Sequence, residues 1–347
     1  MNVGIIFPRF IGPYGGERLV LNEAKELSKL DNKVTLYTRV IENNSIQTLP
    51  SGTSIVQGIG FKTRSHELNA LIDLLLAPFL LTKIKKEHDL VIVVGWQAAF
   101  AGGIIKIFNG KKKIVYRCLE PPRFLYDLKK ESKSNLSFFS KVFLHILSPL
   151  IKSIDYSSVK KCDAVISISK RTKNQVKEIY GIDSEVVEPG IETERFKKYS
   201  KEEARKKLKI NRGAKIYLSV SKLHKRKRID LAIEYFKKNR TKGKTVFFII
   251  GDGPEKENLE KIRGGFKDII FLGRLEDKLV DLYLSAADYF IFTAKNEPFG
   301  IAPLEAKLAG CKIVPKDSTN KIQSWEETAK QLNRIYTRVV NENRHYS

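Results

Sequence analysis

Cysteine is scarce in this sequence of 347 residues, which contains only Cys118, Cys162 and Cys311. The three residues are far apart, and none belongs to a Cys-x-x-Cys pair or to a cluster with histidine. These absences argue against a disulfide framework and against a cysteine-ligated zinc site. An odd number of unclustered cysteines predicts a reducing compartment.

Neither the pattern of a signal peptide nor a long apolar run is found in this sequence. Its first residues, MNVGIIFPRF, contain no basic region followed by an apolar core, so we expect no signal peptide. The most apolar stretch, 68–81, is interrupted by Asp73 and Pro78 and is short for a bilayer-spanning helix. We therefore expect a cytoplasmic protein in which this stretch forms a buried or surface-lying helix.

Two common ligand motifs are missing as well. No Asp-x-Asp sequence occurs, so we expect no metal site and no cofactor. The chain reads GPYGGER over residues 12–18, after the first expected strand, where a dinucleotide-binding protein has GxGxxG. This difference argues against a dehydrogenase.

Positive charge is abundant, with a formal net charge of +24. Residues 101–180 hold 17 Lys and Arg against 6 Asp and Glu, so the excess is concentrated in the middle of the chain. Such a patch favours polyanions: nucleic acid, anionic lipid or a diphosphate-linked substrate. The basic runs lack interleaved aromatic residues and any known nucleic-acid-binding motif, so we expect no nucleic-acid partner.

Short apolar runs alternate with helical patterns along the whole chain, which predicts an α/β protein with two doubly wound parallel sheets. The boundary is expected near Gly190, with domains at 1–190 and 191–321. Strands are expected at 3–7, 34–37, 90–94, 113–116 and 164–168 in the first sheet, and at 216–220, 245–250, 269–272, 289–292 and 312–314 in the second.

The most informative segment reads NEPFGIAPLEA over residues 296–306. It follows an expected strand, and a helix is expected from Ala302 to Ala309. A helix entered through Gly300 offers free backbone N–H groups and a positive dipole end, which favour phosphate. Glu297 on the turn and Glu305 inside the helix can accept hydrogen bonds from hydroxyls on either side of that phosphate. The segment therefore predicts a site for a nucleotide sugar.

Three other loops carry glycine or positive charge at expected strand ends. The basic run SKLHKRKRID at 221–230 follows the first strand of the second domain and is placed to neutralise a leaving diphosphate. Gly15 and Gly16 stand at the opening of the first helix, which is expected at 17–29, and let the backbone approach a ligand. The segments EPGIE at 188–192 and GDGP at 251–254 read as turns.

Together these segments resemble the retaining glycosyltransferases of GT-B architecture, of the family-four, mannosyltransferase-like type, and the resemblance covers nearly the whole chain in order. It implies two Rossmann-like domains facing a cleft, with the acceptor bound by the first domain and the nucleotide sugar by the second. It also implies a closing helix at about 322–343 that returns to the first domain. It also implies catalytic roles for Glu297, Lys227 and Lys222. It assigns donor contacts to Gly16, Gly190, Gly251, Gly300, Ile301, Ala302 and Glu305, and acceptor-side contacts to Gly15, Glu120 and Arg123.

Two departures from the family pattern bear on activity. Leu119 stands where mannosyltransferase-like members carry a histidine two residues before the Pro-Pro pair, with Glu120 and Arg123 as candidates for the polar contacts. After Pro315 and Lys316 the chain passes directly to the closing helix, where the family continues with several dozen further residues. The sequence therefore leaves full activity open, and a non-catalytic GT-B-like subunit that binds a nucleotide sugar or a partner remains the alternative.

The resemblance implies transfer of a hexose with retention of anomeric configuration and without a metal. The leaving phosphate would take the acceptor proton, and Glu297 would orient the sugar. GDP-mannose is the expected donor, with a UDP-sugar as the other choice, and a glycan or lipid-linked molecule is the expected acceptor. The segment 136–154 mixes Phe, Leu and Ile with lysine, which suits either a helix on the cytoplasmic face of an anionic membrane or a core helix.

Overall fold

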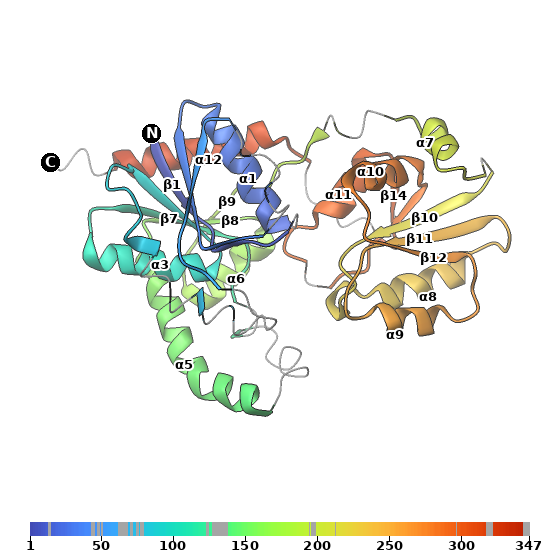
Figure 1. Ribbon diagram of the computed structural model, residues 1–347, viewed down its shortest axis with the longest axis horizontal. Coiled ribbons are helices and arrows are strands. Elements are labelled where there is room, and N and C mark those ends of the chain that lie inside the picture. The colour runs from blue at the N-terminus through green and yellow to red at the C-terminus, as the bar shows by residue number, and fades with distance from the viewer. Residues whose placement is uncertain are drawn as a thin grey trace. The chain divides into compact units, whose positions relative to one another are not determined.

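The computed structural model consists of two compact units, shown in Figure 1. Unit 1 contains Met1–Gly190 and Trp325–Ser347, and unit 2 contains Ile191–Ser324. The structure describes residues 1–12, 15–42, 46, 49, 51–61, 69, 72–73, 76, 80–122, 125–126, 138–193, 195, 199–211, 213–295, 297–316 and 322–342, with backbone only at 138–146.

Unit 1 is built on a parallel sheet of seven strands in the order β5-β3-β1-β6-β7-β8-β9. These strands are β1 (Asn2–Ile6), β3 (Lys33–Thr38), β5 (Thr53–Gln57), β6 (Leu90–Val94), β7 (Lys113–Cys118), β8 (Ala164–Ser167) and β9 (Glu185–Val186). A second, two-stranded sheet pairs β2 (Arg9–Phe10) with β4 (Val40–Ile41). The helices of the unit are α1 (Gly15–Ser28), α3 (Trp96–Phe108), α5 (Phe138–Lys160), α6 (Lys170–Tyr180) and α12 (Trp325–Asn341).

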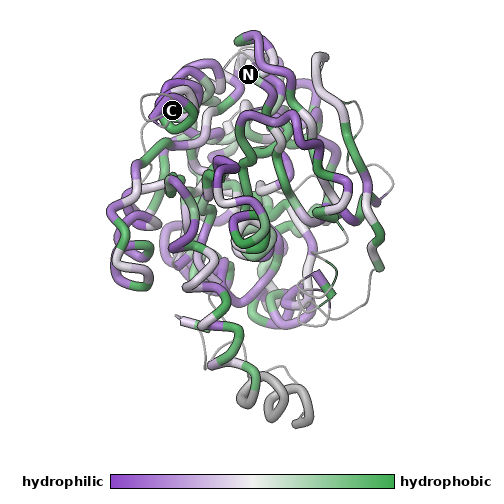
Figure 2. Tube along the Cα trace, turned by 90° about the vertical axis from the view of Figure 1, so that its left-hand side faces the viewer, coloured by the Kyte–Doolittle hydropathy of each residue, from purple (hydrophilic) through white to green (hydrophobic). Residues whose placement is uncertain are grey.

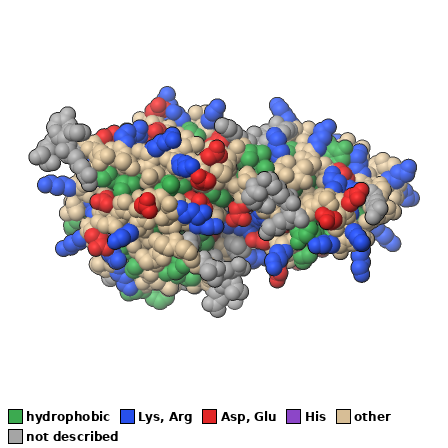
Figure 3. All heavy atoms as spheres, turned by 90° about the horizontal axis from the view of Figure 1, so that it is seen from above, with side chains coloured by type: hydrophobic (Ala, Val, Ile, Leu, Met, Phe, Trp, Pro, Cys, Tyr) green, Lys and Arg blue, Asp and Glu red, His purple; other side chains and the backbone are tan. Residues whose placement is uncertain are grey.

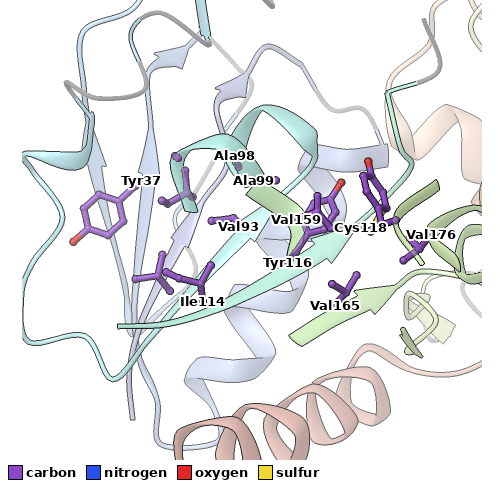
Figure 4. Packing of buried hydrophobic residues seen from close by; sticks show 14 of the residues in the cluster. Tyr37, Val93, Ala98, Ala99, Ile114, Tyr116, Cys118, Val159, Val165 and Val176 are labelled. Carbon is purple, nitrogen blue, oxygen red and sulfur yellow. The ribbon is translucent and has the colours of Figure 1, made fainter. Parts of the chain in front are cut away.

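The core of unit 1 is formed by strands that are apolar on both faces. In β6 all five residues are buried, and Val93 contacts the same cluster as Ile114 and Tyr116 of β7. Figure 4 shows these side chains together with those of the covering helices, such as Ala98 of α3. A strand buried on both sides needs helices on both faces, which the alternating pattern of the sequence supplies.

The closing helix α12 belongs to unit 1, as the resemblance implied, and packs against α1. Leu332 and Tyr336 on its apolar face are fully buried. Asn32 donates a hydrogen bond to Asn333 at 3.1 Å, and Thr328 donates one to the backbone oxygen of Glu188 at 3.0 Å. The final helix is therefore an integral part of the first unit.

Unit 2 contains a parallel sheet of five strands in the order β12-β11-β10-β13-β14. The strands are β10 (Lys215–Val220), β11 (Thr245–Ile250), β12 (Ile269–Gly273), β13 (Tyr289–Ile291) and β14 (Lys312–Val314). The helices are α7 (Lys201–Lys207), η2 (Lys225–Lys227), α8 (Ile229–Asn239), α9 (Lys256–Arg263), α10 (Asp277–Ala286) and α11 (Ile301–Leu308). Tyr217 packs edge-on against Phe236 in the core, with 5.3 Å between ring centroids.

The two doubly wound parallel sheets confirm the predicted fold class, but several element limits differ. The edge strands β5 and β9 were missed, because β5 is largely solvent-accessible and β9 has two residues. Helix α1 begins at Gly15, so both glycines lie in its first turn rather than before it. Most of the apolar stretch 68–81 lies outside the described residues.

Helix α5 extends away from the sheet of unit 1 in Figure 1, and Figure 2 shows hydrophobic and hydrophilic residues alternating along its described part. Leu150 on this helix is 57% exposed. Within the described residues, no helix has the length and apolar character required to cross a membrane. Lys and Arg side chains are spread over the face drawn in Figure 3.

Candidate functional site

The strand order places the candidate site of unit 2 at one edge of its sheet. Strand β10 pairs with β11 on one side and with β13 on the other. The chain proceeds from β10 to β11 and β12 and then returns to β13 on the other side of β10, so the strand order reverses there. Ligands of doubly wound sheets bind beyond the carboxyl ends of the strands at such a reversal. The loops that follow β10 and β13 are the segments that carry the predicted residues.

These two loops are held together by backbone and side-chain hydrogen bonds. The Thr293 hydroxyl donates to the backbone oxygen of Arg228 at 2.8 Å, and the Lys295 amide donates to the backbone oxygen of Arg226 at 3.3 Å. Arg228 adopts a left-handed conformation with φ of 49° and pairs with Asp230 at 2.9 Å. The short helix η2 is thereby fixed against the loop after β13.

This arrangement brings Lys227 to Glu297. The Lys227 ammonium donates to Glu297 Oε2 at 2.7 Å, and the two side chains are 19% and 20% exposed. Lys222 is exposed on the same loop, at the end of β10. A lysine paired with a glutamate at the edge of a sheet can exchange its partner for a phosphate oxygen, while the glutamate accepts from a sugar hydroxyl.

Helix α11 begins beside this pair, at Gly300. Gly300 is the N-cap with φ of 78°, and no side chain caps the helix. A side chain at this position would lie 3.8 Å from Glu297 and 3.4 Å from Pro303. The amides of Ile301 and Ala302 open the helix, and amides in a first helical turn lack intrahelical acceptors. These groups provide a backbone site for an anion next to the Lys227–Glu297 pair.

Gly251 and Gly253 are required by a close approach of backbone to backbone. A Cβ on Gly251 would lie 1.8 Å from the Ser221 oxygen, and one on Gly253 would lie 2.3 Å from the Leu223 oxygen. The Leu223 amide also donates to the Asp252 oxygen at 2.9 Å. The loop after β11 therefore supports the basic loop after β10 from beneath, a role that the turn signal alone did not reveal.

Glu305 lies on α11, and its carboxylate faces Arg195. Arg195 Nη1 is 3.4 Å from Glu305 Oε1, and Arg195 Nη2 is 2.5 Å from Asp281 Oδ1 on α10. Sequence reasoning missed Arg195 and Asp281, because no local pattern links them to Glu305. Gly190 is the last residue of unit 1 and is not among the groups that unit 2 brings together.

In unit 1 the loops after β1 and β7 meet at Gly16. A Cβ at Gly16 would lie 3.6 Å from a methyl group of Leu119 and 3.6 Å from the Phe7 ring. Gly15 begins α1, and Glu120 is half-buried next to Leu119. Arg123 lies outside the described residues. The strand order reverses between β1 and β6, so this edge has the same topology as the site of unit 2.

Glu17 was also missed as a functional candidate. It lies in the first turn of α1 and is 7% exposed. Burial raises the pKa of Glu17 to about 7, against the opposing effect of backbone hydrogen bonds at Glu17 and Ile11. A carboxyl group that titrates near neutral pH thus lies at the Gly15–Gly16 turn.

Comparison with known proteins identifies the family to which both parts of the chain are related. Residues 13–195 match the model of Glycosyltransferase Family 4, and residues 200–332 match the model of Glycosyl transferases group 1. Leu119 lies inside the first match and Lys316 inside the second, so neither departure interrupts the family signature.

Sequence relatives are distant but cover most of the chain. The alpha-1,3/1,6-mannosyltransferase ALG2 of Kluyveromyces lactis is 24% identical over 90% of this chain and 69% of its own length. ALG2 of Homo sapiens is 23% identical over 92% of this chain and 80% of its own length. The alpha-monoglucosyldiacylglycerol synthase of Streptococcus pneumoniae is 24% identical over 90% and 70%.

Solved structures share the fold. WaaG, a glycosyltransferase involved in lipopolysaccharide biosynthesis, superposes with a TM-score of 0.68 at 16% identity, over 99% of this chain and 94% of its own. HepE of Anabaena, solved in complex with UDP and glucose, superposes with a TM-score of 0.65 at 16% identity. The superposition covers 99% of this chain and 93% of HepE. Because the family-four model covers more than half of the sequence, the chain belongs to glycosyltransferase family 4, the GT-B enzymes that transfer a sugar from a nucleotide sugar with retention of configuration.

Proposed function

We propose that the chain transfers a hexose, with mannose as the first choice, from a nucleotide diphosphate sugar to a glycan or lipid-linked acceptor. The observation that carries this proposal is the 2.7 Å contact between Lys227 and Glu297, next to the helix start at Gly300. It places a cation, a carboxylate and helix-start amides at the strand-order reversal of one sheet.

Each group has a separate part in the proposed reaction. Lys227 and Lys222 neutralise the charge that develops on the diphosphate as the sugar leaves, and the amides of Ile301 and Ala302 hold its oxygens. Glu297 accepts a hydrogen bond from the sugar and orients it. Glu305 binds the ribose hydroxyls. The acceptor oxygen bonds to the anomeric carbon as the bond from that carbon to the diphosphate oxygen breaks, and the leaving phosphate takes the proton of the acceptor hydroxyl. Glu297 does not act as a nucleophile in this scheme.

The acceptor is proposed to bind at the edge of unit 1 formed by Gly15, Gly16 and Glu120, with Arg123 on the same loop. Leu119 provides an apolar wall at this edge, because it contacts the position of Gly16. Leu119 occupies the position where mannosyltransferase-like members have a histidine. We therefore propose that Glu120 and Arg123 make the polar contacts with the acceptor.

Mannose as the transferred sugar is supported by the resemblance of the Pro-Pro-Arg loop and by the ALG2 relatives, whose names describe mannosyltransferases. A donor screen tests it: GDP-mannose, UDP-glucose and UDP-galactose are compared by thermal shift, and turnover is followed by release of the nucleoside diphosphate. GDP-mannose is expected to stabilise the protein most and to turn over with a lipid-diphosphate acceptor. Binding of a donor without turnover would indicate a non-catalytic subunit instead.

Metal independence is proposed because Lys227 and Lys222 supply positive charge at the diphosphate position. In the part of the chain that the structure describes, no three His, Cys, Asp or Glu side chains are grouped to hold a metal ion. Transfer is expected to continue in excess EDTA, and its loss with recovery on adding Mg²⁺ or Mn²⁺ would contradict this part of the proposal.

An anionic membrane surface on the cytoplasmic side is the proposed location of a lipid-linked acceptor. The exposed Leu150 and the lysines of α5 support it, because apolar residues with flanking lysines favour anionic interfaces. Co-sedimentation with vesicles of phosphatidylglycerol is expected, with little binding to phosphatidylcholine vesicles. Leu150→Ser should weaken binding, and equal binding to both vesicle types would contradict the proposal.

A further inference from the structure

Arg195 lies at the start of unit 2 and holds together two helices that are separate in the sequence. Its backbone amide donates to the Glu192 oxygen at 3.2 Å, which fixes the turn that carries it. Its side chain is 13% exposed and reaches carboxylates on both α10 and α11.

The two carboxylates differ in their relation to the site. Asp281 on α10 forms the shorter contact, at 2.5 Å, and its side chain is 12% exposed. Glu305 on α11 lies at 3.4 Å from the other terminal nitrogen and is 14% exposed. A guanidinium has a planar fork of donors and can serve two acids at once, which an ammonium does less well.

The charge balance explains why the cation is needed. Two partly buried carboxylates share this one cation and would repel each other without it. Burial by itself lowers the pKa of Arg195, but Asp281 and Glu305 outweigh burial, so its pKa is raised and it stays charged. Without the guanidinium, the Glu305 carboxylate would lose the contact to Arg195 that orients it.

We propose that Arg195 is a positioning residue for nucleotide-sugar binding, which holds the Glu305 carboxylate oriented toward the ribose hydroxyls while Asp281 anchors the guanidinium. The inference rests on the proposed ribose contact of Glu305 and extends it to a residue on a different segment. Arg195 itself does not touch the donor in this scheme. Its contribution is therefore specific to the ribose and independent of the diphosphate.

A second arginine in unit 2 provides a matched control. Arg240 pairs with Asp268 at 2.5 Å, and the two side chains are 22% and 16% exposed. Asp268 directly precedes β12, so this pair lies at the amino end of the strands, opposite the candidate site. Loss of Arg240 removes a comparable ion pair without affecting Glu305.

The test measures binding of GDP and UDP by titration calorimetry, each against its 2′,3′-dideoxy counterpart. Arg195→Met is expected to weaken the preferred ribonucleotide about tenfold, the scale for a lost hydrogen bond to a charged group. The dideoxy form should change by less than about twofold, since it lacks the hydroxyls that Glu305 binds. The affinity of Arg195→Lys for the ribonucleotide should lie between those of the wild type and Arg195→Met. The control Arg240→Met should leave the affinities for the ribonucleotide and the dideoxynucleotide unchanged.

Glu305→Gln separates failure of the inference from failure of the proposed function. Glu305→Gln is expected to reduce the difference in affinity between the ribonucleotide and its dideoxy form. If neither Arg195 variant reduces that difference while Glu305→Gln does, the inference about Arg195 is wrong and the proposed role of Glu305 is kept. If Glu305→Gln leaves this difference in affinity unchanged, or if neither nucleotide binds the wild type, the proposed donor site is wrong. The inference about Arg195 is then wrong as well. Equal weakening of both nucleotide forms by Arg195→Lys would show a general structural role and overturn the inference, even if Arg195→Met does not fold.

Discussion

Lys227 and Glu297 form an ion pair of 2.7 Å although 70 positions separate them in the chain. Strand β10 brings them together, because it is bordered by β13 and the loops after both strands leave the same edge of the sheet. The hydrogen bonds of Thr293 then fix the distance between the loops. The pair places the proposed leaving-group cation next to the proposed sugar-binding carboxylate.

Removing either partner should lower the rate of transfer more than donor affinity. We expect Glu297→Gln and Lys227→Ala each to reduce kcat by about 100-fold or more, the scale for losing a preorganised electrostatic contact in a transition state. Steady-state kinetics with the best donor would measure it. Arg240→Met serves as a control with unchanged kcat, and near-normal turnover in both site variants would contradict the assignment.

Adding a methyl group at Gly251 should destabilise unit 2. The Cβ of Gly251→Ala would lie 1.8 Å from the Ser221 oxygen at a φ of 136°, so the backbone must move. We expect a loss of at least about 2 kcal/mol in the free energy of unfolding, measured with urea. Gly243→Ala is the control: its φ is 73° but no atom lies within 4 Å, and a loss of about 1 kcal/mol is expected. Equal losses would show that contact with the basic loop is unimportant.

Glu17 should make stability depend on pH. Its pKa is raised from an ordinary 4.5 to about 7 by burial, so the folded state favours the protonated form. The resulting stabilisation is present below about pH 4.5 and is lost as the pH rises through about 7, up to roughly 3 kcal/mol.

Glu17→Gln should remove this decline. The difference in free energy of unfolding between pH 5 and pH 8 is therefore expected to be smaller in the variant than in the wild type. Asp155, whose pKa burial raises to about 6, changes stability in the same direction in both proteins and cancels in the comparison. Identical pH profiles would show that Glu17 titrates normally.

The buried ion pair between Arg117 and Glu23 in unit 1 should tolerate loss of both partners better than loss of one. Arg117 is fully buried and lies 2.7 Å from Glu23 on α1. Arg117→Met leaves the Glu23 carboxylate buried without its partner and should cost about 3–5 kcal/mol. The double variant with Glu23→Leu should recover most of that loss.

Lys330→Met provides the surface comparison for this pair. Lys330 and Glu326 are 51% and 65% exposed, so loss of their contact should change stability by less than about 1 kcal/mol. Urea unfolding of the three variants would measure these differences. An Arg117→Met variant as stable as Lys330→Met would contradict the account.

Local patterns predicted most of the strands because fully buried runs such as Leu90–Val94 are apolar throughout. Strand β5 was missed because none of its residues is buried, and β9 because two residues form no pattern. The start of α1 was displaced because glycine is a poor helix former, yet Gly15 and Gly16 occupy the first turn, where fewer intrahelical bonds are needed.

The segment at 296–306 could be interpreted from spacing alone, since a turn glycine and two glutamates point to one ligand chemistry. The roles of Arg195 and Asp281, and the support that Gly251 gives to the basic loop, could not be interpreted from spacing. Each depends on a contact between distant segments.

The amino-acid sequence by itself thus determined the order of strands and helices and the loops in which the glycines and charged residues lie. It could do so because hydrophobic periodicity and turn chemistry act over a few residues. Only the tertiary structure decided which cation meets which carboxylate: Lys227 with Glu297, Arg195 with Glu305 and Asp281, and Arg117 with Glu23. Strand pairing sets those distances, since it brings together loops whose own sequences contain no information about their neighbours.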